Sequence, residues 1–205
     1  MLLLVQYTLI FAAVLLLVAL GGCFSEHSGV INIGLEGIMV IGALGGALVM
    51  RFLPYSGGSV GADIGMFAAV LGASVLFGMI YSLLLAVACI NFKADQTIVG
   101  TAMNLLGTAL ATVVVKSMNT AANPDDHSSE IQYFNQKKAF LSNIGSFELN
   151  WFMIVAFLLL IVSIVLLYKT RFGLRLRACG EHPQAADSVG INVYKMRWAG
   201  VLISG

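Results

Sequence analysis

The sequence predicts an all-α integral membrane protein, built as a polytopic bundle of helices. Several uncharged apolar runs approach the roughly 20 residues that a helix needs to cross a bilayer. Only 10% of the residues are charged, against about a quarter in soluble domains. The runs also lack the alternation of apolar and polar residues that is typical of a membrane β-barrel.

The spans and breaks follow one another in a simple order. The expected membrane helices are 1–24, a segment within 25–50, 64–90, 97–115 and 151–168. The stretches between them are polar or rich in turn residues: 51–61, 91–95 and the long hydrophilic segment 116–150. A basic loop over 169–197 is followed by a last apolar run, 198–205, which is too short to cross a bilayer. We therefore expect one transmembrane domain over 1–205 that is a fragment, incomplete at its C-terminal end.

The segment 25–50 is unusual because its apolar part, 38–50, is too short to span alone. Either that part is a re-entrant half-helix, or the polar stretch before it enters the membrane too. A helix that begins near Ser28 or Gly29 would be long enough and would place Glu36 about 10 Å along its axis. A carboxylate at that depth usually faces a bundle interior or a watery cavity, which makes Asn32 and Glu36 candidate functional residues.

A second polar group lies within the expected helix 97–115. Thr101, Asn104 and Thr108 are spaced at i, i+3 and i+7, which places them on one helical face. They either hydrogen-bond to neighbouring helices, as the bilayer interior demands, or line a pathway. Glu36 has two similar alternatives, because it either bonds a neighbouring backbone N–H or lines the same pathway.

Lysine and arginine predict the orientation, because loops on the cytoplasmic side retain these residues. Six of the 11 basic residues lie between Tyr168 and Trp198. The loop 169–197 is therefore expected in the cytoplasm and the segment 116–150 outside the cell. Counting back one span at a time places the N-terminus outside.

The basic loop contains the signals of a short helix over 183–189. Pro183 suits a first helical turn, Glu181 places negative charge just before it, and Gly190 suits the position beyond its end. Its small apolar face consists of Ala185, Ala186 and Val189. A helix of two turns is not stable alone, so it must dock either on lipid headgroups or on a cytoplasmic partner.

Two stretches resemble the permease subunits of ATP-binding-cassette importers. The more specific is Ser-Gly-Val-Ile-Asn-Ile-Gly-Leu-Glu-Gly at 28–37, and the other is the loop 172–192. The resemblance is closer to the branch that carries nucleosides and simple sugars than to the branched-chain amino-acid branch. It extends loosely through 93–104 and covers nearly the whole chain except 116–150. His182 stands where the family has Asn, a departure that bears on docking.

The resemblance implies a transport subunit of the cytoplasmic membrane with no catalytic site and no cofactor of its own. A separate ATPase subunit would bind and hydrolyse ATP, and this chain contains no Gly-x-x-x-x-Gly-Lys-Ser/Thr phosphate loop. The other implied partners are a second permease, identical or related, an extracytoplasmic substrate-binding protein and the lipid bilayer. The net charge of +1 and the lack of a basic stripe exclude a nucleic-acid partner.

The resemblance also assigns candidate residues to two sites. The loop helix would sit in a cleft of the ATPase, and the coupling residues are Arg175, Arg177, Gly180, Glu181, Pro183, Ala185, Ala186 and Gly190. A neutral, hydroxyl-rich nucleoside or sugar needs amides, hydroxyls and an acceptor along its path. The residues that offer these groups are Asn32, Glu36, Thr101 and Asn104.

Two other hypotheses remain open on the sequence. An ion-gradient-driven secondary transporter would use Glu36 as its ion site, but it would not need the helix 183–189. A structural or assembly subunit would use Asn32, Glu36 and Asn104 only to bond neighbouring helices. A metal site is not indicated, because the three cysteines lack metal-ligand spacing.

Overall fold

The computed structural model describes residues 2–53, 60–131, 141–144 and 147–205. The elements in order are α1 (Leu2–His27), α2 (Leu35–Phe52), α3 (Val60–Ala86), the π-helical turn η1 (Val87–Asn91), α4 (Gln96–Ala122), β1 (Leu141–Ile144), β2 (Phe147–Asn150), α5 (Trp151–Lys169), α6 (Arg171–Glu181), α7 (Pro183–Ser188) and α8 (Val193–Ser204). Among these residues five helices, α1 to α5, are long and apolar enough to cross a membrane. The all-α polytopic class is therefore confirmed.

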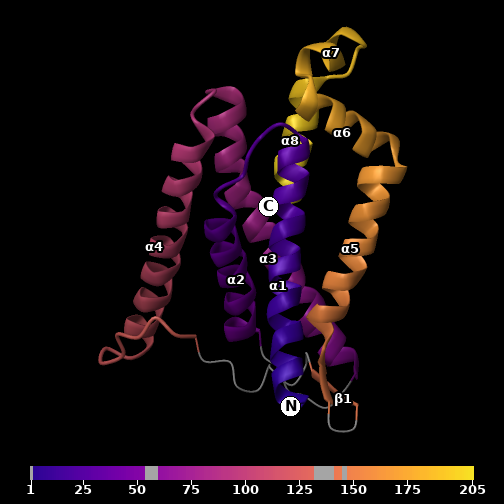
Figure 1. The fold of residues 1–205 in the computed structure, drawn as a ribbon. Coiled ribbons are helices and arrows are strands. Elements are labelled where there is room, and N and C mark those ends of the chain that lie inside the picture. Colours follow the sequence, from indigo (N-terminus) through magenta and orange to yellow (C-terminus); the bar gives the residue numbers. More distant parts are fainter. Residues whose placement is uncertain (1, 54–59, 132–140, 145–146) are drawn as a thin grey trace.

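The five long helices lie side by side, with α4 at one flank and α5 at the other (Figure 1). α2 packs between α3 and α4, and α8 packs against α1 and α3. The helices α6 and α7 lie at the end where α1 finishes, whereas the N-terminus and the strand β1 lie at the opposite end (Figure 1). The two ends of the bundle therefore carry different parts of the chain.

The hydrophilic segment 116–150 is partly ordered into regular elements. α4 continues through Ala122 and ends just before Pro124, which disfavours helical backbone in the residue before it. Strands β1 and β2 form an antiparallel hairpin in which Leu141 pairs with Asn150 and Ile144 with Phe147. The expected start of this segment at residue 116 is thus wrong by the last two turns of α4.

The alternative in which a helix begins near Ser28 or Gly29 is wrong. α1 instead runs on to His27, and Gly29 then adopts a φ of +82°. The N–H of Gly29 bonds the carbonyl of Glu26 at 2.9 Å, and the N–H of Val30 bonds that of Ser25 at 3.3 Å. This pair of bonds is the Schellman motif, which ends a helix at a left-handed glycine.

A new helix, α2, starts only at Leu35 and has 18 residues. α2 extends beyond the apolar part 38–50 at both ends and is therefore long enough to cross a bilayer. Neither a re-entrant half-helix nor a helix through the polar stretch is required for the crossing. Glu36 consequently lies in the first turn of α2 and not about 10 Å along a helix.

The seam between α2 and α4 is very close because glycines face each other across it. A Cβ on Gly37 would lie 2.6 Å from the carbonyl oxygen of Met103, and one on Gly107 would lie 2.9 Å from the Cα of Gly37. Small residues of this kind let helix backbones approach within lipid. The close approach brings side chains of α4 within reach of the start of α2.

Candidate functional site

Asn32 lies in the turn between α1 and α2 and is only 6% exposed. Its Nδ2 donates a hydrogen bond to Oγ of Ser204 at 2.9 Å, so it links this turn to α8. Its Oδ1 accepts no hydrogen bond from any described residue, although buried amide oxygens are almost always paired. Asn32 therefore keeps a free acceptor at the junction of the turn with α8.

Asn104 holds the start of α2 from a neighbouring helix. Its Oδ1 accepts from the backbone N–H of Gly37 at 2.8 Å, and its Nδ2 donates to the carbonyl of Ile33 at 3.0 Å. The N-cap residue of α2, Gly34, makes no side-chain capping bond. Asn104 thus supplies the cap that α2 lacks, and the hydrogen-bonding alternative describes this residue.

Thr101 and Thr108 bond within their own helix and not to a neighbour. The hydroxyl of Thr101 donates to the carbonyl of Thr97 at 2.9 Å, and that of Thr108 donates to the carbonyl of Asn104 at 3.0 Å. Both side chains are exposed on the surface of the chain. On the predicted common face of α4, Asn104 therefore bonds to the start of α2, whereas the hydroxyls of Thr101 and Thr108 lie on the surface.

Glu36 is exposed in the first turn of α2, beside the Gly37 amide that Asn104 holds. Its carboxylate lies at the positive end of the helix, where negative charge is stabilising. Among the described residues it has no hydrogen-bond or ion-pair partner. The structure thus brings Glu36 and Asn104 to one turn, with Asn32 turned toward α8.

The predicted loop helix is present as α7, which ends at Ser188, one residue before the expected end. Gly190 has a φ of +82°, its N–H bonds the carbonyl of Asp187 at 2.9 Å, and that of Ile191 bonds Ala186 at 3.1 Å. This is a second Schellman motif, so the predicted position of Gly190 just beyond the end of the helix is confirmed. Ala186 is buried against the rest of the chain, whereas Ala185 is exposed.

The basic loop 169–197 is more helical than expected, because α6 precedes α7 and α8 follows it. Thr170 caps α6 by accepting from the N–H of Gly173 at 3.2 Å. Glu181 is the last residue of α6 and directly precedes His182, the N-cap of α7, so it lies just before the loop helix, as expected. Pro183 occupies the first position of α7, also as expected.

The two arginines of α6 lie in different surroundings. Arg175 is exposed, whereas the guanidinium of Arg177 lies 5.0 Å from the ring centre of Tyr168 on α5. This cation–π contact fixes Arg177 against the bundle. Gly180 ties the other end of α6 to α1, because a Cβ there would lie 2.6 Å from the carbonyl oxygen of His27.

The comparisons with known proteins agree with this arrangement. The family described as "Branched-chain amino acid transport system / permease component" matches residues 4–205. The chain belongs to this permease family. No solved structure matches it significantly.

Two relatives of the permease are about two-fifths identical to it. The guanosine ABC transporter permease protein NupQ of Bacillus subtilis (strain 168) is 42% identical over 98% of this chain and 63% of the relative. The nucleoside ABC transporter permease protein NupC of Lactococcus lactis subsp. cremoris (strain MG1363) is 40% identical over 96% of this chain and 62% of the relative. The permease therefore spans about three-fifths of the length of these relatives.

A third relative is named for a different substrate. The putative glucose ABC transporter permease protein TsgC13 of Haloferax volcanii is 32% identical over 95% of this chain and 56% of the relative. The nucleoside and simple-sugar resemblance predicted from residues 28–37 and 172–192 is thus confirmed.

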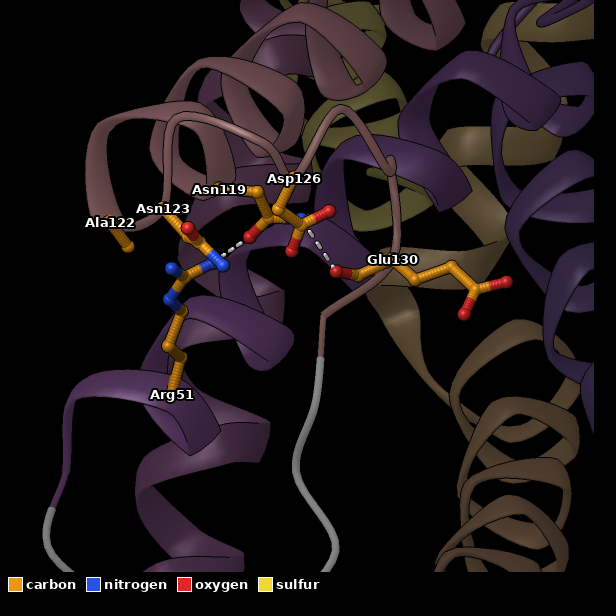
Figure 2. A pocket seen from close by; sticks show the side chains of 6 residues that line it. All are labelled: Arg51, Asn119, Ala122, Asn123, Asp126 and Glu130. Carbon is orange, nitrogen blue, oxygen red and sulfur yellow. Dashed lines mark hydrogen bonds between the residues drawn. The ribbon is translucent and has the colours of Figure 1, made fainter.

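The permease has a polar pocket at the end of the bundle opposite α7, which sequence reasoning missed. Its volume is about 320 Å³, and Figure 2 shows the side chains that line it: Arg51, Asn119, Ala122, Asn123, Asp126 and Glu130. Asn119 is 6% exposed, and its Oδ1 accepts from the guanidinium of Arg51 at 2.6 Å. Its Nδ2 donates to the backbone carbonyls of Ser128 at 3.0 Å and Glu130 at 2.8 Å.

Asn119 thus joins α2, α4 and the loop after α4. Asp126 on this loop accepts from the backbone N–H of Ser128 at 2.9 Å. Hydrogen bonds from the hydroxyl and then the N–H of Ser128 hold the pKa of Asp126 below its usual value, with a smaller effect of the His127 and Arg51 charges. The carboxylate of Glu130 points away from Arg51 (Figure 2). A signal for this pocket existed in the sequence, namely one arginine in an otherwise uncharged neighbourhood.

Proposed function

We propose that this chain is the membrane-spanning permease subunit of an ATP-driven importer that carries nucleosides or simple sugars across the cytoplasmic membrane. Its family and the guanosine and nucleoside permeases among its relatives support this assignment. Nucleosides and sugars are neutral and rich in hydroxyls, and the polar groups of α4 between Thr101 and Thr112 are correspondingly uncharged amides and hydroxyls.

The observation that carries the proposal is the position of α7. This helix stands at one end of the bundle (Figure 1), held through Ala186 but with Ala185 and Val189 exposed. Val189 is 76% exposed, although it is apolar and lies outside the membrane-spanning helices. Such a surface suits a protein partner, and we assign it to the cleft of a separate ATPase subunit, which supplies ATP binding and hydrolysis.

The coupling route starts at α7 and follows α6 to the turn between α1 and α2. α6 packs against α1, α5 and α8, and Gly180 lies against the backbone of His27. A displacement of α7 by the ATPase would therefore reach the start of α2, where Asn32, Glu36 and Asn104 lie. Movement between inward-open and outward-open arrangements is then two-state gating driven by ATP binding.

The orientation and the remaining partners complete the proposal. The basic residues around α6 and α7 support a cytoplasmic position for that end and an outward position for the opposite end. An extracytoplasmic binding protein delivers the substrate there, and a second permease, identical or related, encloses the pathway. The ion-gradient alternative gains no support, since Glu36 is an exposed residue of a first helical turn.

The test uses the full-length permease with its ATPase and binding protein in native membranes. In the Ala185→Arg variant we expect guanosine uptake to fall to background and the ATPase to stop co-purifying. The matched control is Ala121→Arg, an exposed alanine in the last turn of α4 at the opposite end. Normal uptake in Ala185→Arg would reject the coupling role of α7. Uptake that persists without the ATPase and stops when the proton gradient is dissipated would establish the gradient-driven alternative.

A further inference from the structure

One line of polar side chains follows α4 from end to end, and we call it the α4 stripe. Its members share one helical register and are Thr101, Asn104, Thr108, Thr112 and Asn119. The three threonines are exposed, whereas Ser82 of α3 is 0% exposed and Ser163 of α5 is 7% exposed. α4 therefore presents a row of polar groups on its surface.

The two amides of the stripe show where it runs. Asn104 bonds Gly37 near the start of α2, and Asn119 bonds Arg51 near its end. Since both amides reach α2, the threonines between them lie beside the seam of α2 and α4. Exposed apolar side chains flank the stripe: Leu105 lies four residues after Thr101, Val113 follows Thr112, and each is more than half exposed.

Both ends of the stripe meet polar features that lipid would not accommodate. At the α7 end lies the exposed carboxylate of Glu36, one residue before the Gly37 that Asn104 clamps. At the other end Asn119 forms the wall of the pocket that also contains Arg51 and Asp126 (Figure 2). A hydrated track along the stripe would connect these two polar ends of the bundle.

We infer that the α4 stripe lines the path of the transported solute, with Thr108 and Thr112 as its wall and the Arg51–Asp126 pocket as its outer subsite. The inference rests on the proposed function and adds residues to its pathway. The hydroxyls of Thr108 and Thr112 donate to the carbonyls of Asn104 and Thr108 on their own helix, at 3.0 and 2.8 Å. Their oxygens remain able to accept hydrogen bonds from a hydroxyl-rich neutral solute.

The stripe suits passage better than tight binding. Between Thr101 and Thr112 it carries only amides and hydroxyls, so each contact with a passing hydroxyl is a single neutral hydrogen bond, worth about 1 kcal/mol net. Lys116 follows four residues after Thr112 in the same register. The outer pocket differs, because it combines the guanidinium of Arg51 with the carboxylate of Asp126, charged groups that can each bond hydroxyls of a ligand. A solute would be held in the pocket first and then pass along the threonines.

The decisive experiment is cysteine labelling in the full-length transporter assembled with its ATPase, after Cys23, Cys89 and Cys179 are replaced by alanine. We expect Thr108→Cys and Thr112→Cys to react with a charged, water-soluble methanethiosulfonate about tenfold faster than Val113→Cys, because only a hydrated thiol ionises. Guanosine should slow the reaction at 108 and 112 and leave the rate at 113 unchanged. Equal rates at all three positions would place the stripe in lipid or in a dry interface and overturn the inference.

A second measurement covers variants that fail to assemble. The double variant Thr108→Val, Thr112→Val keeps the side-chain shape, and we expect guanosine uptake to fall several-fold with unchanged recovery of the assembled complex. The matched control is Thr8→Val on α1, whose exposed hydroxyl donates to the carbonyl of Leu4 at 2.8 Å in the same way. Unaltered uptake in the double variant would overturn the pathway and leave the importer intact. Absence of ATP-dependent uptake in the unmodified complex would instead refute the proposed function itself.

Discussion

Asn104 shows how much one side chain determines at the residue scale. It caps α2 from α4, using its oxygen on Gly37 and its nitrogen on Ile33. The helix start that carries Glu36 is therefore held by another helix and not by its own residues. A residue that looked like a pathway contact is, first of all, a clamp.

We predict that Asn104→Leu lowers the free energy of unfolding by about 1 to 2 kcal/mol, because it removes a cap and leaves two backbone groups unpaired. The measurement is an SDS titration of the purified permease in micelles. The control, Thr108→Val, should change stability by less than about 0.5 kcal/mol, since that hydroxyl bonds only its own helix. Equal effects of both substitutions would contradict the clamp.

Asp126 gives a second prediction, about pH. Because Ser128 lowers the pKa of this carboxyl in the folded loop, its stabilising effect is complete above the unfolded pKa of about 3.9. That effect is lost as pH falls through the folded pKa. We expect hydrogen exchange at the Ser128 amide, corrected for the intrinsic rate, to accelerate in this acidic range.

The variant Asp126→Asn should show faster exchange at Ser128 already at neutral pH, and the neighbouring Asp125→Asn should not. Protection of Ser128 that is independent of pH and of Asp126 would show that the loop is held by Asn119 alone.

At the scale of elements, α6 and α7 connect an exposed tip to the bundle. Thr170 caps α6, Arg177 stacks on Tyr168 of α5, and Gly180 lies against His27 of α1. α7 itself is held by Ala186 and ended by Gly190. The tip is therefore joined to two spanning helices through α6.

Gly180→Val tests that connection. We predict a loss of about 1 to 3 kcal/mol in unfolding free energy, because the new side chain meets the backbone carbonyl of His27, which cannot rotate away. Gly72→Val on α3 is the matched control, since a Cβ there meets nothing within 4 Å. The measurement is again SDS-induced unfolding, and equal stability of the two variants would contradict close packing of α6 on α1.

At the scale of the whole molecule, the bundle has two chemically different ends. One end carries α6, α7 and the turn between α1 and α2, and the other carries the hairpin and the Arg51–Asn119 pocket (Figure 1). Every span leads from one end to the other. A single pair of labelling sites can therefore report the orientation of the whole permease.

We predict that a membrane-impermeant maleimide labels Ser129→Cys in intact cells and Ser188→Cys only in inside-out vesicles. Both serines are exposed, and they lie at opposite ends of the bundle. Native Cys179 should not interfere, because it is fully buried and desolvation raises the pKa of its thiol. Labelling of both sites from one side would contradict the topology, and a reversed pattern would overturn the orientation only.

The sequence predicted α5 to within one residue at its C-terminal end, because a long uncharged apolar run can only be a span. It predicted α7 through Pro183 and Gly190, which act on their own backbone. It misplaced the start of α2, although Gly29 carried the same C-terminal signal as Gly190. The Arg51–Asn119 bond was missed because the two residues lie 68 positions apart, and no local pattern joins them.

Runs of consecutive residues were enough to predict the membrane class, the approximate spans, the family and the short loop helix. These depend on the length, apolarity and turn chemistry of neighbouring residues, which are local properties. Packing was needed to show which polar residue serves which purpose: Asn104 as a clamp, Asn32 as a link to α8, and the threonines of α4 as an outward-facing stripe. A hydrogen bond within lipid depends on its partner, and these partners come from distant parts of the chain.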